Sequence, residues 1–191
     1  RVRDLSAHVA DDAGQRYIYY GSIGKLLPCF AVFGKEAHVG QAFSALDPNL
    51  VLANITRKMS LNTDLCDIAQ GEVAIPPISL KQMDTKGPYT VQTALTAFGY
   101  YNFFTHGWSP SIVLEKSKQM AVEAFDETVD AVVERLLPLY LTAASDGTFL
   151  NLDMEEYRDL DLTIAVFTRI LDRPEFLNLE ATLTEAQESL P

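Results

Sequence analysis

The spacing of apolar positions is clearest in residues 111–191, where two amphipathic helices are predicted. Apolar and aromatic side chains recur every three or four positions in a first stripe, formed by Phe125, Val129, Val132, Val133, Leu136, Leu137 and Tyr140. A second stripe consists of Leu160, Ile164, Phe167 and Leu171. Such spacing places the apolar side chains on one buried helix face. We therefore expect helices over most of residues 127–143 and 155–171, and Pro138 should bend or end the first.

A short apolar segment separates these helices. Residues 145–147 (Ser-Asp-Gly) predict a turn, and residues 148–152 (Thr-Phe-Leu-Asn-Leu) predict a short buried strand. Asp153 follows directly and can cap the second helix, with Glu156 where a capping box needs it. Helix, strand and helix in this order form the αβα pattern of a parallel α/β architecture, in which functional groups lie just beyond the carboxyl ends of strands. Asp153 is therefore a candidate site residue.

Residues 1–110 give a weaker pattern, because Gly and Pro interrupt them every few positions. The expected elements are helices at residues 4–13, 35–46 and 48–60, a strand at residues 16–20, and a buried helix within residues 90–104. Residues 73–80 contain Pro76 and Pro77 and predict an exposed connector, since a central strand or helix interior rejects paired prolines. The expected fold class is α/β and mostly helical, with an all-α helical domain as the alternative.

Composition changes near residue 110, and we place a boundary at residues 107–110 (Gly-Trp-Ser-Pro). Residues 1–110 hold nine basic and nine acidic residues, nine of the ten glycines and thirteen of the nineteen aromatic residues. Residues 111–191 hold six basic and seventeen acidic residues. This asymmetry predicts a helix-rich aromatic region of unknown family, followed by an acidic αβα unit.

The net charge of −11 argues against nucleic acid as a partner, because phosphate binding needs a basic face. The longest apolar stretches, residues 17–33 and 91–104, are interrupted by Lys25 and Pro28 or by polar residues, so no transmembrane segment is expected. Cys29 and Cys66 lie far apart without a CxxC pattern, which favours buried reduced thiols and a cytoplasmic setting. The sequence is compatible with a homo-oligomer.

Other candidate sites are weaker. The histidines His8, His38 and His106 are widely separated, so no metal site is expected. The aromatic residues of segment 100–108 favour a core segment over a ligand pocket with His106 as its polar group. Residues 21–25 (Gly-Ser-Ile-Gly-Lys) lack the spacer of a phosphate-binding loop and favour a glycine-rich turn.

Two segments closely resemble the proline dehydrogenase domain of bacterial bifunctional proline-utilisation flavoproteins. They are residues 124–140 (AFDETVDAVVERLLPLY) and 147–167 (GTFLNLDMEEYRDLDLTIAVF), and the resemblance extends over residues 124–181. It implies a distorted barrel that binds FAD and oxidises L-proline to pyrroline-5-carboxylate. It also implies that Asp153 is a catalytic carboxylate beside the substrate amine, and that Met154 contributes to cofactor binding.

A second reading of the chain is a non-catalytic helical binding or scaffold protein that shares this segment. The family holds the substrate carboxylate with paired arginines, and this chain contains no Arg-Arg pair. On that reading Asp153 is a helix cap at the start of a solvated acidic face. Whether the chain is an enzyme therefore depends on the site around Asp153.

Overall fold

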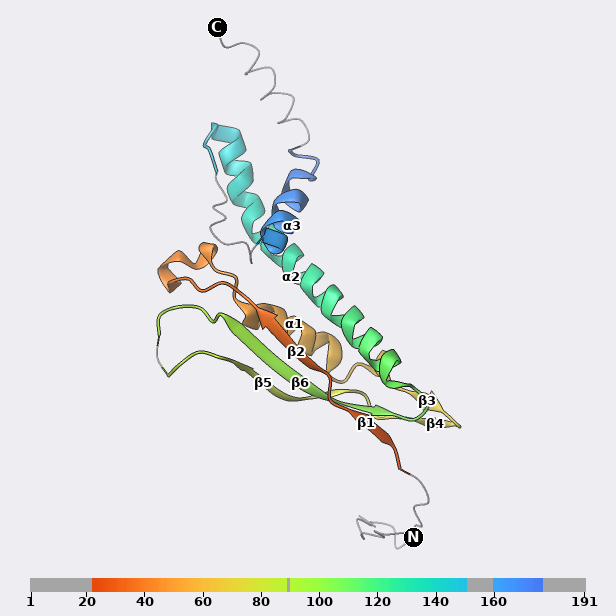
Figure 1. The fold of residues 1–191 in the computed structure, drawn as a ribbon. Coiled ribbons are helices and arrows are strands. Elements are labelled where there is room, and N and C mark those ends of the chain that lie inside the picture. The colour runs from red at the N-terminus through yellow and green to blue at the C-terminus, as the bar shows by residue number, and fades with distance from the viewer. Residues whose placement is uncertain (1–21, 89, 151–159, 177–191) are drawn as a thin grey trace, which may run out of the picture.

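An antiparallel sheet with helices on one side forms the centre of the molecule (Figure 1). The computed structural model describes residues 22–88, 90–150 and 160–176. The central strand is β6 (Thr96–Thr105), which pairs with β5 (Ile78–Asp84) along one side. β2 (Cys29–Phe33) pairs with the first half of β6, and β1 (Gly24–Leu26) pairs with its last residues.

Helix α1 (Pro48–Met59) confirms the helix expected at residues 48–60. Asp47 is its N-cap, and the carboxylate of Asp47 accepts a hydrogen bond of 2.9 Å from the backbone nitrogen of Asn49. Pro48 occupies the first turn, where its missing N–H group costs nothing. The apolar stripe of α1 faces the sheet and consists of Val51, Leu52, Ile55 and Met59, all of them buried.

Helix α2 (Pro110–Asp146) is 37 residues long and extends beyond the sheet. Its first half contributes Val113 and Ala124 to the core that α1 forms with the sheet. Its second half contributes Val129 and Val133 to another cluster, with Val166, Ile170 and Phe176 from α3 (Leu160–Leu171) and the turn after it. The helix expected at residues 127–143 is confirmed, and Pro138 lies inside α2 without ending it. The boundary proposed at residues 107–110 stays a prediction.

The expected buried helix within residues 90–104 is wrong, because residues 96–105 form β6. Ala97, Gly99, Tyr101 and Phe103 alternate along the strand on the side that α1 and α2 cover. A methyl group on Gly99 would lie 2.9 Å from the carbonyl oxygen of Lys81 and 3.3 Å from Leu52. Ala97 and Gly99 thus let α1 approach the sheet closely, and this packing favours a strand where the sequence pattern predicted a helix.

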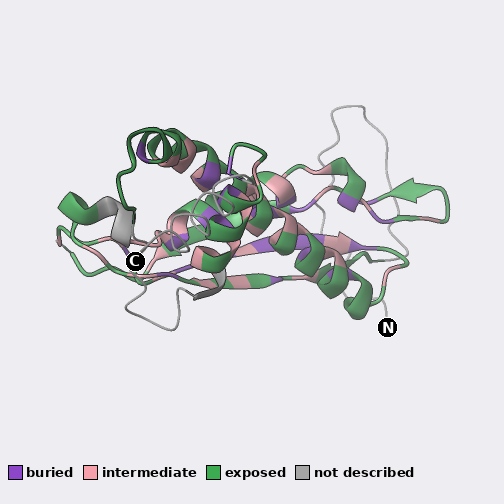
Figure 2. Ribbon diagram, turned by 90° about the horizontal axis from the view of Figure 1, so that it is seen from above, coloured by how far each residue is buried: buried purple, intermediate pink, exposed green. Residues whose placement is uncertain are grey.

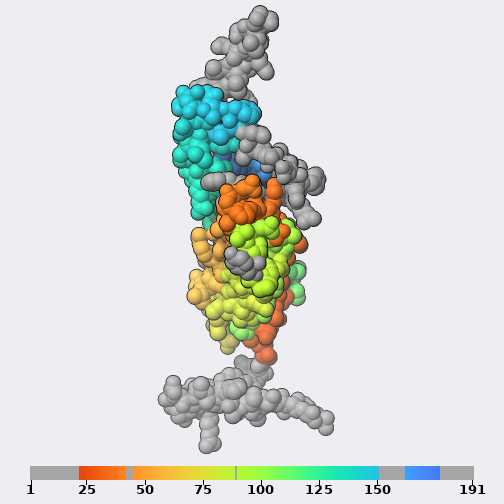
Figure 3. Space-filling model, turned by 90° about the vertical axis from the view of Figure 1, so that its left-hand side faces the viewer, coloured from red at the N-terminus to blue at the C-terminus, as the bar shows by residue number. Residues whose placement is uncertain are grey.

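The connections differ in part from expectation. Residues 35–46 form a 3₁₀ helix, η1 (Val39–Ser44), instead of an α-helix, and backbone bridges join Lys35 to Leu46 and His38 to Gln92. In Figure 3 the orange segment that contains residues 35–41 lies next to the green segment that contains Gln92. A second 3₁₀ turn, η2 (Thr63–Leu65), leads into a small hairpin. The hairpin consists of β3 (Ile68–Ala69) and β4 (Glu72–Val73).

The connector expected at residues 73–80 is confirmed only for residues 74–77, because Val73 ends β4 and β5 begins at Ile78. Both prolines were expected to be exposed, and this is wrong for Pro77, which is buried. The carbonyl oxygen of Pro77 accepts a hydrogen bond of 2.8 Å from the nitrogen of Leu61. The connector is therefore packed against the end of α1.

The barrel-like unit expected in residues 111–191 is not formed by the described residues. Residues 148–150 of the expected strand are irregular, and the Phe149 side chain is 87% exposed. Every strand pair in the described part of the chain is antiparallel, whereas a (βα) barrel needs parallel pairs. The fold is nevertheless mixed α/β, so the all-α alternative is wrong.

The remaining sequence predictions fall partly or wholly outside the described residues. The helix expected at residues 4–13 and the strand expected at residues 16–20 lie wholly outside them. The helix expected at residues 155–171 is confirmed over α3. Its outer residues Ile164 and Phe167 are exposed, whereas the sequence predicted a buried stripe. Among the described helices, none is both long and apolar enough to cross a membrane.

Candidate functional site

Asp153 and Met154, the two site residues expected from the sequence, lie outside the described residues. The structure describes the chain before and after them, up to residue 150 and from residue 160. α2 ends at Asp146 and is capped by Gly147, whose positive φ of 73° is a left-handed conformation that glycine favours, and α3 begins at Leu160. The local structure around the carboxylate therefore remains a prediction from the resemblance.

A cleft of about 530 Å³ lies between α1 and α2. Figure 2 shows, from above, the helices lying over the sheet. Its lining is polar and charged, and contains Arg57, Lys58, Asn62, Asp64, Leu65, Lys116, Gln119, Met120, Glu123 and Glu127. Three of these side chains are cationic and three are carboxylates, so the lining has no net formal charge.

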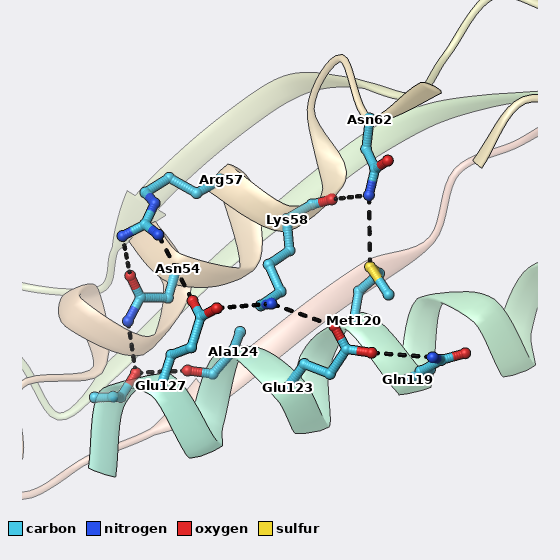
Figure 4. A network of polar contacts seen from close by, with 10 residues as sticks. Asn54, Arg57, Lys58, Asn62, Gln119, Met120, Glu123, Ala124 and Glu127 are labelled. Carbon is cyan, nitrogen blue, oxygen red and sulfur yellow. Dashed lines mark hydrogen bonds and ion pairs between the residues drawn. The ribbon is translucent and has the colours of Figure 1, made fainter. Parts of the chain in front are cut away.

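Lys58 is the centre of the charged network in this cleft (Figure 4). The Lys58 ammonium lies 2.8 Å from Oε1 of Glu127 and 3.2 Å from Oε2 of Glu123. The hydrogen bond to Glu127 and then that to Glu123 raise the pKa of Lys58. The hydrogen bond of 2.9 Å from Gln119 lowers the pKa of Glu123, and Lys58 lowers it further. These ion pairs join the two helices across the cleft.

A chain of hydrogen bonds extends the network to Arg57. Arg57 donates to Oδ1 of Asn54 over 3.3 Å, and Asn54 donates to the hydroxyl of Thr128 over 2.9 Å. Oε2 of Glu127 is buried and has no hydrogen-bond partner, although the Arg57 guanidinium lies 3.6 Å away. This carboxylate oxygen therefore retains the capacity for a further hydrogen bond.

The other end of the cleft is formed by Asn62 and Lys116. Asn62 donates to the carbonyl oxygen of Lys58 over 2.8 Å and contacts the sulfur of Met120 at 3.8 Å. The Lys116 ammonium lies 4.5 Å from the centre of the Trp108 ring, a cation–π contact that leaves its N–H groups available to a ligand. Donors and acceptors thus converge on one cavity, which suits a small molecule that carries both charges.

A second polar constellation holds the turn between β6 and α2. Oδ2 of the buried Asp67 accepts backbone hydrogen bonds of 2.7 Å from His106, Gly107 and Trp108. Burial raises the pKa of Asp67, but the three N–H donors outweigh it and the net shift is downward. Nε2 of His106 lies 3.1 Å from a carboxylate oxygen of Glu72 in the β3–β4 hairpin. These contacts hold the turn after β6 against the β3–β4 hairpin, which is a structural role.

Most of the weaker sequence candidates are placed by the structure. His106 does not line a ligand pocket with the aromatic residues, since Tyr101 and Phe103 are buried in the core. Gly24 and Lys25 belong to β1 and form no phosphate-binding loop. The cysteines are free, but Cys29 is exposed and Cys66 is half-buried, so the expected burial of both thiols is wrong.

The described residues contain no group of three His, Cys, Asp or Glu side chains that could hold a metal ion. Sequence reasoning missed the cleft because Lys58 and its carboxylate partners are some 65 positions apart, and only the packing of α1 on α2 brings them together. Asp67 likewise gives no signal in the sequence.

Comparison with known proteins identifies relatives of much of the chain. A family model described as "Proline dehydrogenase" matches residues 51–187. Protein RocB of Bacillus subtilis (strain 168) is 37% identical over 125 residues, which are 65% of this chain and 22% of that protein. The uncharacterized protein YqjN of the same strain is 41% identical over 176 residues, which are 92% of this chain and 30% of that protein. The chain therefore spans less than a third of these relatives, and no solved structure matches it.

Proposed function

The chain belongs to the proline dehydrogenase family, and on this premise we propose that it acts on L-proline as a proline dehydrogenase-like protein. The observation that carries the proposal is the family match over residues 51–187, which includes both segments of the resemblance and Asp153. A cytoplasmic location is part of the same proposal.

Asp153 is the residue proposed to act on the substrate. A carboxylate at this position would hold the ammonium group of L-proline by a charge-assisted hydrogen bond. By holding the amine in a fixed orientation relative to an electron acceptor, the carboxylate would stabilise the transition state more than the bound substrate. In this family FAD is the implied acceptor, and when bound it would supply the redox chemistry, with Met154 at its side.

The described cleft does not fit a flavin. Its lining contains no aromatic ring on which the flavin ring system would stack, and Asp64, Glu123 and Glu127 would face the pyrophosphate with like charge. The three cations are balanced by these carboxylates and leave no excess positive charge for a diphosphate. We therefore derive no catalytic step through FAD, and the enzymatic proposal rests on the family match and Asp153.

The test combines a spectrum with turnover. Purified protein that carries oxidised flavin absorbs near ~450 nm, and proline-dependent reduction of a dye reports the reaction. Asp153→Asn should abolish dye reduction and leave thermal unfolding unchanged, because Asn caps a helix about as well as Asp. Asp159→Asn, which changes a neighbouring acidic residue, is the matched control and should keep turnover. Wild-type protein without flavin or turnover, even after addition of FAD, contradicts the enzymatic proposal.

A second candidate function is non-catalytic binding of a small zwitterion such as L-proline in the cleft between α1 and α2. The observation that favours it is the convergence of Lys116, Arg57 and Glu127 on one cavity. A ligand carboxylate would meet the cations and a ligand ammonium the carboxylate. On this reading the chain is a binding protein that shares the family's sequence.

Calorimetry with L-proline separates the two functions. Binding in the cleft should weaken about tenfold or more in Lys116→Met, because an ammonium that meets the ligand is lost. Lys118→Met removes a lysine of the same helix whose side chain is 72% exposed, and it should bind as wild type does. Proline binding that survives Lys116→Met but fails in Asp153→Asn supports the first function and excludes the second.

A further inference from the structure

One face of the sheet has no described element over it. α1 and α2 both cover the same side, as the burial of Ala97, Tyr101 and Phe103 shows. The strand register places the alternate residues on the opposite side, which we call the open sheet face. Its apolar residues are Phe33, Ile78, Met83, Phe98, Tyr100 and Phe104.

The composition of the open sheet face is that of an interface. An antiparallel sheet that faces water normally carries polar residues on that side. Here the Phe33 side chain is 69% exposed, and Ile78 and Met83 are 43% and 41% exposed. The charged residues that the register places on this face are Lys25 and Lys81, both of them basic. An apolar face of this kind marks a protein contact surface.

The same chain carries a second uncovered apolar surface, on α3. Val166 and Ile170 pack against α2, whereas Ile164, Phe167 and Leu171 are exposed at intervals of three and four residues. The turn after this stripe bears the exposed carboxylates of Asp172 and Glu175, whereas Arg169 and Arg173 are already paired with carboxylates of α2. The lysines of the open sheet face and the carboxylates after α3 therefore carry opposite charges, and both surfaces are otherwise apolar.

We propose that the open sheet face is a docking surface for α3 of a second copy of this chain, in a symmetric dimer with two such contacts. Sheet-to-sheet pairing of the open faces is disfavoured, because it would bury Lys25 and Lys81 of both copies against one another. A reciprocal helix-on-sheet dimer avoids this and is closed by a twofold axis. A stable dimer buries roughly 1,600 Å² in total, so each contact needs about 800 Å². The inference is independent of the proposed function.

Analytical ultracentrifugation of the whole chain over a concentration series up to about 100 µM tests the proposal. Wild-type protein should dimerise. Met83→Ser on the sheet and Phe167→Ser on α3 should each weaken dimerisation by about tenfold or more, because each alters both contacts. Leu114→Ser changes a side chain of α2 that is 59% exposed and belongs to neither surface, and it should dimerise as wild type does. Circular dichroism and thermal unfolding verify that each variant is folded.

A mixture of the two variants provides the sharpest readout. A heterodimer of Met83→Ser and Phe167→Ser keeps one intact contact. In that contact the unchanged α3 of the Met83→Ser copy docks on the unchanged sheet of the Phe167→Ser copy. The mixture should therefore associate more tightly than either variant alone, by about tenfold. Wild-type protein that is monomeric at about 100 µM overturns the proposal, and so does a mixture that associates no better than the single variants. Dimerisation unaffected by both substitutions also overturns it.

Discussion

The backbone nitrogen of His106 lies 2.7 Å from Oδ2 of Asp67, a carboxylate that is completely buried. Gly107 and Trp108 donate to the same oxygen, so one side chain satisfies three consecutive N–H groups at the end of β6. The carbonyl oxygen of Asp67 also accepts a hydrogen bond from Ala74 in the segment after β4. Asp67 thereby fixes both the hairpin and the direction in which α2 begins.

Replacement of Asp67 should therefore destabilise the fold strongly. Asp67→Ala leaves three N–H groups without their acceptor and should lower the free energy of unfolding by about 3 kcal/mol. Asp67→Asn keeps one acceptor oxygen but loses its charge, and should cost about 1 kcal/mol. Urea unfolding measures both values. Asp64→Ala, an exposed neighbour, is the control and should stay within about 0.5 kcal/mol of wild type. Equal stability of Asp67→Ala and wild type would contradict the anchoring role.

The contribution of Asp67 should also depend on pH. Because its folded-state pKa lies below the usual value of 3.8, its ionised form stabilises the fold above that value. The stability difference between wild type and Asp67→Asn should be constant from about pH 7 to about pH 5. It should shrink as the pH falls below 3.8 and through the lower folded-state pKa. Thermal unfolding at a series of pH values measures this, and a difference that grows on acidification would refute it.

The contrast between α1 and β6 shows what the sequence can predict. α1 was predictable because Asp47 and Pro48 mark its start and its apolar residues recur with a helical period. In β6 apolar residues occupy nearly every position from 97 to 104, so neither period stands out. The decisive factor is the contact of Gly99 with α1 and β5, which exists only in the folded chain. The same limit applies to the cleft, whose charges come from two helices far apart in sequence.

Lys58 should control the ionisation of Glu123 across the cleft. In Lys58→Met the pKa of Glu123 should rise toward its usual value of 4.5, because an ammonium 3.2 Å away is lost. The rise should be incomplete, since the larger cause of the lowered pKa is the hydrogen bond from Gln119. Titration of the glutamate side chains by NMR gives the pKa directly. Lys118→Met, which affects an exposed ion pair with Glu115, should leave the pKa of Glu123 unchanged. A Glu123 pKa that does not move in Lys58→Met would show that the ion pair is absent in solution.

Gly34 should be the glycine least tolerant of a side chain, because the end of β2 passes directly under the start of α1. A Cβ atom there would lie 2.2 Å from the carbonyl oxygen of Leu46 and 2.6 Å from a ring carbon of Pro48. Neither neighbour can move freely, since the Leu46 carbonyl accepts a hydrogen bond of 2.9 Å from Lys35 and Pro48 begins α1.

Gly34→Ala should therefore lower the free energy of unfolding by about 2 kcal/mol, as overpacking against backbone does. Gly87→Ala is the matched control, because nothing lies within 4 Å of its Cβ position. That substitution should be neutral or stabilising by about 0.5 kcal/mol, since alanine restricts the unfolded chain more than glycine does. Urea unfolding of the two variants side by side separates the effect of crowding at Gly34 from the general effect of glycine replacement. Equal stability of both variants would mean that α1 is not held against β2 at Leu46.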